Sequence, residues 1–282
     1  MTGEMSQDFM RSIRRQVRFS TLMRLALLLI IASGIVATPF YSSGNRPLDL
    51  LWAASAFAGL TWIGLTALSI KQIRAANQGI VYMANGRLDL AEEQLISAAS
   101  QFSLYRIGKL RACHNLAVVA HSRGSFDEAA ALLDGVIAML RGPDRSLGKT
   151  SRLVLADCRL SLGSPDIAAE VLKPVISQFD EMPLAEQLLL LPIETRCQVA
   201  TGDYDAALNN LAERVRRAEL LDSPRAAQVH ALLAEACRRK GRQAEAAFFM
   251  RRAQLYADLS DLAEERPGLR DLVFPDTSAD NI

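Results

Sequence analysis

The sequence has few aromatic residues, three histidines and almost no net charge, and each shortage excludes a class of protein. Aromatic residues make up 6% of the chain although hydrophobic residues make up 50%. The hydrophobic residues are rich in alanine and leucine, which favour helices, so we expect an all-α protein. A net charge of +1 gives no field that attracts a polyanion, and we therefore predict no nucleic-acid partner.

Metal-binding and catalytic patterns are also lacking. The cysteines Cys113, Cys158, Cys197 and Cys237 are 45, 39 and 40 residues apart, and none forms a Cys-x-x-Cys pair. We predict that they are small buried residues in a reducing compartment and that the protein holds no metal and no cofactor. No nucleophile, base and orienting group occur together in a known motif, so we predict no enzymatic activity.

One segment resembles a phosphate-binding loop at first sight. Five residues separate Gly142 from Gly148, before Lys149 and Thr150, whereas the nucleotide-binding pattern needs four. That pattern also needs a preceding strand, and a helix is expected here. We interpret 141–149 as a linker between helices.

Long apolar runs are confined to the first quarter of the chain. Residues 1–24 are polar and basic, and two uncharged runs follow at 25–41 and 50–70. About 20 helical residues span the hydrocarbon core of a bilayer, so we predict a transmembrane helical hairpin over 25–70. Small residues four apart, in the pairs Ser33/Ala37 and Ser55/Gly59, offer faces where its helices can approach closely.

The charges around the hairpin predict its orientation. Five arginines precede the first run, and Lys71 and Arg74 follow the second, so both ends should face the cytoplasm at the cell (inner) membrane. A cleaved signal peptide over the first run is the alternative, although the second run would then still anchor the rest. With no proline or glycine from Ser69 to Gln78, we expect one helix over 50–85 that enters the next domain directly.

Glycines recur at a nearly constant interval after the second run. They are 38, 39, 39 and 39 residues apart, and an alanine follows each by five residues and a large apolar residue by nine. The residue seven places before each glycine is mostly small. We interpret each glycine as the end of one helix. The alanine five residues later would belong to the next helix and contact the first. The glycines are Gly86, Gly124, Gly163, Gly202 and Gly241.

These units resemble the tetratricopeptide repeat family. The resemblance rests on turns such as Gly86-Arg-Leu-Asp-Leu-Ala91 and Gly124-Ser-Phe-Asp-Glu-Ala129, and on the pairs Leu116-Ala117 and Leu233-Ala234. It implies an α-solenoid of about five helix pairs over 71–260, followed by a cap or disordered tail at 261–282. The spacing exceeds the family's 34 residues, and most units lack the large aromatics. The superhelical pitch is therefore not predicted, and a generic helical-repeat solenoid is the alternative.

Prolines are expected to interrupt two of these helices. Pro174 falls in the second helix of the third unit and Pro192 in the first helix of the fourth, where each should kink or split its helix. Pro165, Pro183 and Pro224 fall instead at expected helix starts, where proline is favoured.

In the family, the first helix of each pair lines a concave groove that holds a partner. The resemblance therefore implies a partner-binding groove of mixed charge, suited to a segment with acidic and apolar residues, whereas a solvated face is the alternative. The candidate groove residues are Arg111, His114, His121, Asp157, Arg196, Gln228, Glu235 and Arg238.

Two functional hypotheses follow. In the first, the protein is a membrane-anchored, non-catalytic scaffold or adaptor that binds a protein partner, such as a peptide segment or a subunit of a membrane complex. In the second, the hairpin is the working part of a larger integral-membrane assembly and the repeats dock it. Both imply contact with the lipid bilayer.

Overall fold

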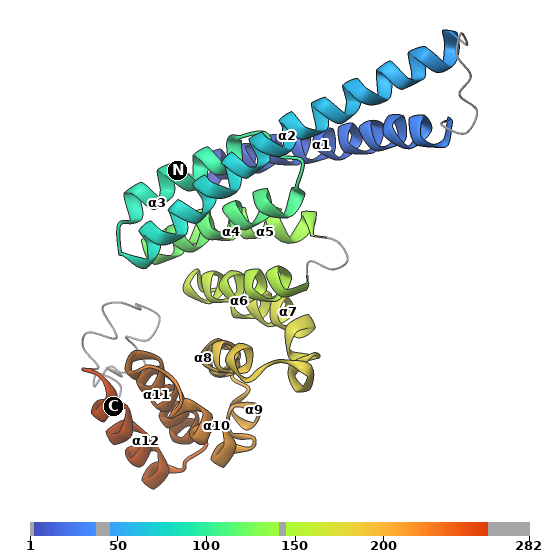
Figure 1. Ribbon diagram of the computed structural model, residues 1–282. Coiled ribbons are helices and arrows are strands. Elements are labelled where there is room, and N and C mark those ends of the chain that lie inside the picture. The colour runs from blue at the N-terminus through green and yellow to red at the C-terminus, as the bar shows by residue number, and fades with distance from the viewer. Residues whose placement is uncertain (1–2, 38–45, 141–144, 259–282) are drawn as a thin grey trace. The chain divides into compact units, whose positions relative to one another are not determined.

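The computed structural model describes residues 3–37, 46–140 and 145–258, and within these ranges it contains helices joined by turns. The expected all-α class is therefore confirmed. The helices form two compact units, residues 1–148 and residues 149–282. Figure 1 shows the helices paired along the chain in each unit.

The first unit contains two long helices and three shorter ones. In chain order they are α1 (Gly3–Ala37), α2 (Arg46–Ala84), α3 (Leu88–Ser100), α4 (Arg106–Ser122) and α5 (Phe126–Met139). Helix α2 runs for 39 residues without a break, so the expected continuous helix is confirmed. Its second half packs on α3 as the first helix pair.

The second unit continues the pairing from α6, whose first residues belong to the first unit. Helices α6 and α7 make one pair, α8 pairs with the short α9, and α11 pairs with α12. The elements are α6 (Arg145–Ser161), α7 (Pro165–Ile176), the 3₁₀ helix η2 (Phe179–Glu181), α8 (Leu184–Ala200), α9 (Tyr204–Leu208), α10 (Leu211–Ala218), α11 (Ser223–Arg239) and α12 (Gln243–Tyr256).

The five turn glycines all end a helix in the same way. Each has a φ between 69° and 78°, a left-handed conformation that a residue with a Cβ adopts at a cost. The residue after each glycine donates its N–H to the carbonyl five residues earlier at 2.8–2.9 Å, as Ser125 does to Ala120. This bond satisfies a free carbonyl at the helix end, and the next helix starts two residues after the glycine. The predicted role of the glycines is confirmed.

The small residues around each turn let the two helices of a pair touch. The alanine five places after each glycine is buried, as is the residue seven places before it. At Gly79 in α2 a Cβ would lie 2.7 Å from Cγ of Leu95 in α3. The large apolar residue of each unit then fills the space beside this contact, and Leu95, Leu133 and Leu172 are completely buried.

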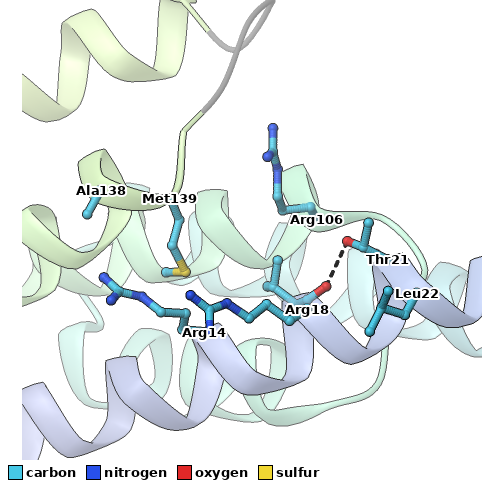
Figure 2. Close-up of a pocket in the computed structure, with 8 residues that line it drawn as sticks. Arg14, Arg18, Thr21, Leu22, Arg106, Ala138 and Met139 are labelled. Carbon is cyan, nitrogen blue, oxygen red and sulfur yellow. Dashed lines mark hydrogen bonds between the residues drawn. The ribbon is translucent and has the colours of Figure 1, made fainter.

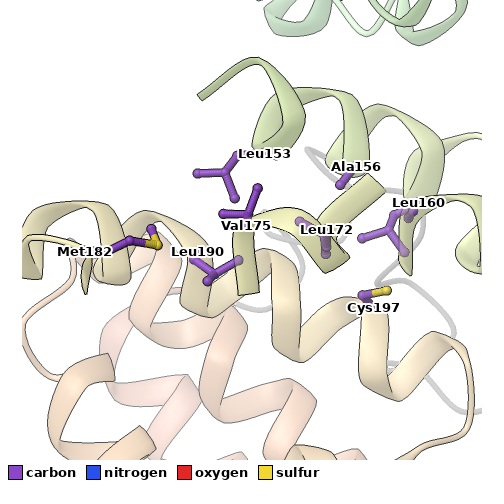
Figure 3. Close-up of a cluster of buried hydrophobic side chains, with 9 residues drawn as sticks. Leu153, Ala156, Leu160, Leu172, Val175, Met182, Leu190 and Cys197 are labelled. Carbon is purple, nitrogen blue, oxygen red and sulfur yellow. The ribbon is translucent and has the colours of Figure 1, made fainter. Parts of the chain in front are cut away.

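In the second unit the same positions build a continuous apolar cluster. Leu153 and Leu160 of α6, Leu172 of α7 and Leu190 of α8 pack together in it (Figure 3). Cys197 joins this cluster, and all four cysteines are buried and none of them forms a disulfide. Burial raises the pKa of the Cys113 thiol to about 12. The prediction that the cysteines are small core residues is confirmed.

The structure adjusts the expectations for two prolines and one linker. Pro174 and Pro192 lie inside α7 and α8, and each helix continues past its proline without being split. The helix that is divided is the one that pairs with α8. It breaks into α9 and α10 at Asn210, whose φ is 51°. Asparagine tolerates this conformation better than most residues. The linker at 141–149 is shorter than expected because α6 already begins at Arg145. The expected positions of Pro165, Pro183 and Pro224 at helix starts are confirmed.

The basic segment 1–24 is not a separate element. Residues 3–24 are the first part of α1, which continues into the apolar run. The buried residues Ser6, Met10, Ile13, Val17 and Ser20 recur every three or four positions and face α5 and α4. The apolar positions were visible in the sequence, but the four arginines between them concealed the stripe. The predicted tail 261–282 and residues 42–45 of the polar stretch between the two apolar runs lie outside the described residues, and α2 already begins at Arg46.

Candidate functional site

Three of the predicted groove residues lie along one face of α4. Arg111 is exposed, and His114 and His121 follow it at intervals of three and seven residues. His114 is largely enclosed, and burial lowers its pKa to about 4. The His121 ring meets the edge of Phe126 at 5.4 Å. Arg111 is thus the one of the three whose side chain is accessible to a partner.

Asp157 and Arg196 face each other across neighbouring helix pairs. The Arg196 guanidinium donates to Asp157 Oδ1 at 2.7 Å and to Ser161 Oγ at 3.3 Å. Both charged side chains are nearly inaccessible, with 6% of Arg196 and 9% of Asp157 exposed. Because two buried opposite charges satisfy each other, this pair joins α6 to α8, and neither group presents a free charge to a partner.

The predicted groove residues of α11 are mostly buried. Gln228 and Glu235 are 2% and 3% exposed, and the Glu235 carboxylate accepts from Nε of both Arg238 and Arg239 at 2.7 Å. Arg238 is partly exposed. The contacts of each of these side chains depend on the neighbouring helices.

His230 is a buried residue of α11 that the sequence did not single out. Its ring stacks on Tyr256 at 5.6 Å and on Phe249 at 6.0 Å. Neither ring nitrogen has a hydrogen-bond partner within the described chain. Burial first, and then the nearby Arg252, lower its pKa to about 4. The ring therefore stays neutral at neutral pH.

Lys109 fixes α1 to the repeats. It is 1% exposed, and its Nζ donates to Ala99 O at 3.0 Å and to Gln16 Oε1 of α1. Burial lowers its pKa to about 8, and proximity to Cys113 partly opposes this. Close packing adds to the attachment, since a Cβ at Gly135 of α5 would lie 2.7 Å from Met10 Cε.

Beside this contact, α1 and α5 enclose a cleft of about 580 Å³. Arg14 and Arg18 extend from α1 toward Met139 of α5, and Arg106 stands on the first turn of α4 (Figure 2). The Thr21 hydroxyl donates to the Val17 carbonyl at 2.8 Å. No carboxylate is among the residues that line the cleft, which are Arg14, Val17, Arg18, Thr21, Leu22, Arg106, Ala138 and Met139.

Helices α1 and α2 are long and apolar enough, over Met5–Ala37 and Asp49–Ala84, to cross a membrane. Of the most apolar 18 residues of each, only 17% and 11% are buried, unlike a helix in the core of a soluble protein. The two helices touch where Gly34 meets Ser55, whose hydroxyl donates to Ile30 O at 3.1 Å. The contact thus uses Ser55 as expected, but it pairs Ser55 with Gly34 and not with the Ser33 face.

Comparison with known proteins identifies the repeats. The family model described as tetratricopeptide repeat matches residues 76–144 and 198–261. The family match supports tetratricopeptide repeats in both units. Helices α6 and α7 lie between the matched stretches, and their turn glycine Gly163 has the same left-handed backbone as the other four.

Two solved structures are similar to the repeats. Both are crystal structures of a putative kinesin light chain from Podosopora anserina with nearly identical TPR-like repeats, and one of them carries a single substitution. Each is 24% identical and covers 65% of this chain, with TM-scores of 0.48 and 0.47 over 92% and 93% of the known chains. No curated protein matches the chain.

The match to the tetratricopeptide repeat family model favours a protein-binding scaffold. Within 3–37, 46–140 and 145–258, no three histidine, cysteine or acidic side chains gather as metal ligands would. What remains for recognition is the set of accessible charged residues on the helix faces, such as Arg111, and the arginine-lined cleft beside α1.

The Asp157–Arg196 pair gives a first prediction. Replacing Arg196 by Met leaves the Asp157 carboxylate buried without the guanidinium, so we expect the free energy of unfolding to fall by about 3–5 kcal/mol. The matched control is Lys173→Met, which removes an ion pair to Glu170 with both side chains more than two-thirds exposed and should cost less than about 1 kcal/mol. Denaturant unfolding measures both. Equal stability of the two variants would contradict a structural role for Arg196.

His230 gives a prediction on pH. Its pKa is near 4 when folded and near 6.5 when unfolded, so between these values the unfolded chain binds more protons. Stability should therefore fall as the pH drops from 6.5 to 4, by up to about 1.4 kcal/mol per pH unit. His230→Phe keeps the stacking but removes the proton site. The melting temperature of this variant, relative to that of the natural protein, should therefore rise from pH 7.5 to pH 5. Parallel pH profiles of the melting temperature would refute this assignment.

Proposed function

We propose that this protein is a membrane-anchored scaffold whose tetratricopeptide repeats hold a partner protein at the cytoplasmic face. The observation that carries the proposal is the continuity of α2, which leads from an apolar segment directly into the first helix pair. A helix without a hinge holds the repeats at a fixed distance from whatever surrounds the apolar segment.

The exposed apolar side chains support a bilayer around the hairpin. Leu29 of α1 and Leu60 of α2 are 68% and 69% exposed, and many neighbours are similar. Water around so many leucine and isoleucine side chains is unfavourable, at about 25 cal/mol for each Å² of apolar surface. Lipid chains remove this cost, and the arginines of α1 with Lys71 and Arg74 favour the cytoplasmic side for the repeats.

The anchor is tested by charging the hairpin. In a bilayer, Leu29→Arg and Leu60→Arg each raise the insertion free energy by about 2.5–3.5 kcal/mol. The double variant should therefore leave the membrane fraction after an alkaline wash. The control is Leu220→Arg with Leu255→Arg, which charges two residues of the repeats that are 59% and 85% exposed and should stay bound like the natural chain. Retention of the hairpin variant would exclude a spanning hairpin.

The binding surface is proposed along α4, where Arg111 projects beside the largely enclosed His114. An exposed arginine on a helix face suits a peptide segment with acidic and apolar residues, because the arginine pairs with a carboxylate and steers the approach. The buried Asp157, Arg196, Gln228 and Glu235 lie in the second unit and are not part of this surface.

A photo-crosslinking residue at position 111 tests this surface in native membranes. We expect one protein adduct, because a bound partner lies within reach of the side chain. The same residue at the exposed Lys173 should give no adduct of that mass. An adduct pattern that is identical at both positions, or absent at 111, would contradict the proposed surface.

A further inference from the structure

The cleft between α1 and α5 contains positive charge that the fold does not use. Within the described ranges neither Arg14 nor Arg18 takes part in an ion pair, whereas Arg11 of the same helix pairs with Asp8 at 2.9 Å. Both side chains lie along the cleft floor beside Met139 (Figure 2). Two guanidinium groups on one helix repel each other, and an anion between them relieves the repulsion.

The position of Arg18 along the hairpin indicates which anion is available. Arg18 is 16 residues before Gly34, and Lys71 is 16 residues after Ser55, the residue that Gly34 touches. Because the two helices are antiparallel and rise equally, Arg18 lies roughly level with Lys71, the first charge after the second apolar run. This level is the boundary of the proposed membrane segment, where lipid phosphates lie.

The surroundings of the cleft also suit a lipid. Leu22 lines it and is 68% exposed, and Phe19, on the next turn back along α1, is 61% exposed. Acyl chains pack on such side chains, while a planar guanidinium binds phosphate oxygens through two parallel N–H bonds. A free phosphate compound has no acyl chains and would make no contact with these apolar side chains.

We propose that Arg14 and Arg18, with Arg106 at the rim, bind the phosphate of an anionic phospholipid. The site rests on the proposed membrane anchor, and it fixes the rotation of α1, and thereby of the repeats that Lys109 attaches to it, relative to the bilayer. Basic pockets beside transmembrane helices bind headgroups by the same chemistry.

The test uses the full chain in nanodiscs of phosphatidylcholine with about one-third phosphatidylglycerol. After transfer to detergent, native mass spectrometry counts the phosphatidylglycerol molecules retained on the protein. We expect one tightly held molecule on the natural chain and an approximately tenfold lower occupancy on the Arg14→Gln/Arg18→Gln variant. The matched control, Arg11→Gln/Arg15→Gln, removes the same charge from the same helix outside the cleft, and its occupancy should stay within about twofold of the natural chain.

The outcomes separate the site from the anchor. Equal losses in both double variants mean general attraction of the basic helix to anionic lipid and overturn the site. Displacement of the lipid by millimolar inorganic phosphate overturns the choice of a lipid as the ligand. A natural chain that enters no nanodisc overturns the proposed anchor itself, whereas a chain that enters and retains no phosphatidylglycerol overturns the lipid site alone. Melting temperatures of all three proteins verify that the variants are folded.

Discussion

The close contact between the two helices of each pair is the constraint on which the rest of the structure depends. A helix pair is too small to bury its own apolar face, so it is stable only against neighbours that present the same pattern. The left-handed glycine turns the chain back within three residues, and small side chains let the backbones approach. At Gly79 the approach is so close that a methyl group would strike Leu95. Each further pair then reuses this geometry.

Helix α1 adds an element outside the repeat pattern. Its buried stripe packs on α5 and α4 in its first part and meets α2 near Gly34 in its second. The Lys109 ammonium, held by Gln16 and the Ala99 carbonyl, places a polar connection at the centre of this packing. Helix α1 therefore links the repeats to the apolar hairpin, as α2 also does. Two such links resist a rotation that a single helix would allow.

The charges of the molecule serve two purposes, and burial separates them. Asp157 with Arg196, and Glu235 with Arg238 and Arg239, neutralise each other and join or stiffen helices. Arg14, Arg18 and Arg111 lie at accessible positions, where a guanidinium has most to gain from an external anion. The accessible arginines next to well-packed helices are therefore the groups that we propose for recognition.

The sequence by itself determined the helical class, the five helix-ending glycines, the continuity of α2 and the burial of the cysteines, because each depends on local backbone preference or on a short period. The contacts of α1, the burial of Asp157 and Arg196, the stacking of His230 and the break at Asn210 were decided only by the tertiary structure. An arginine on a helix face looks the same in sequence whether it faces water or a carboxylate on the next pair. Arg111, thirteen residues before Gly124, and Arg196, six residues before Gly202, were both predicted to line the groove. Only the tertiary structure shows that Arg196 is buried against Asp157 while Arg111 is exposed.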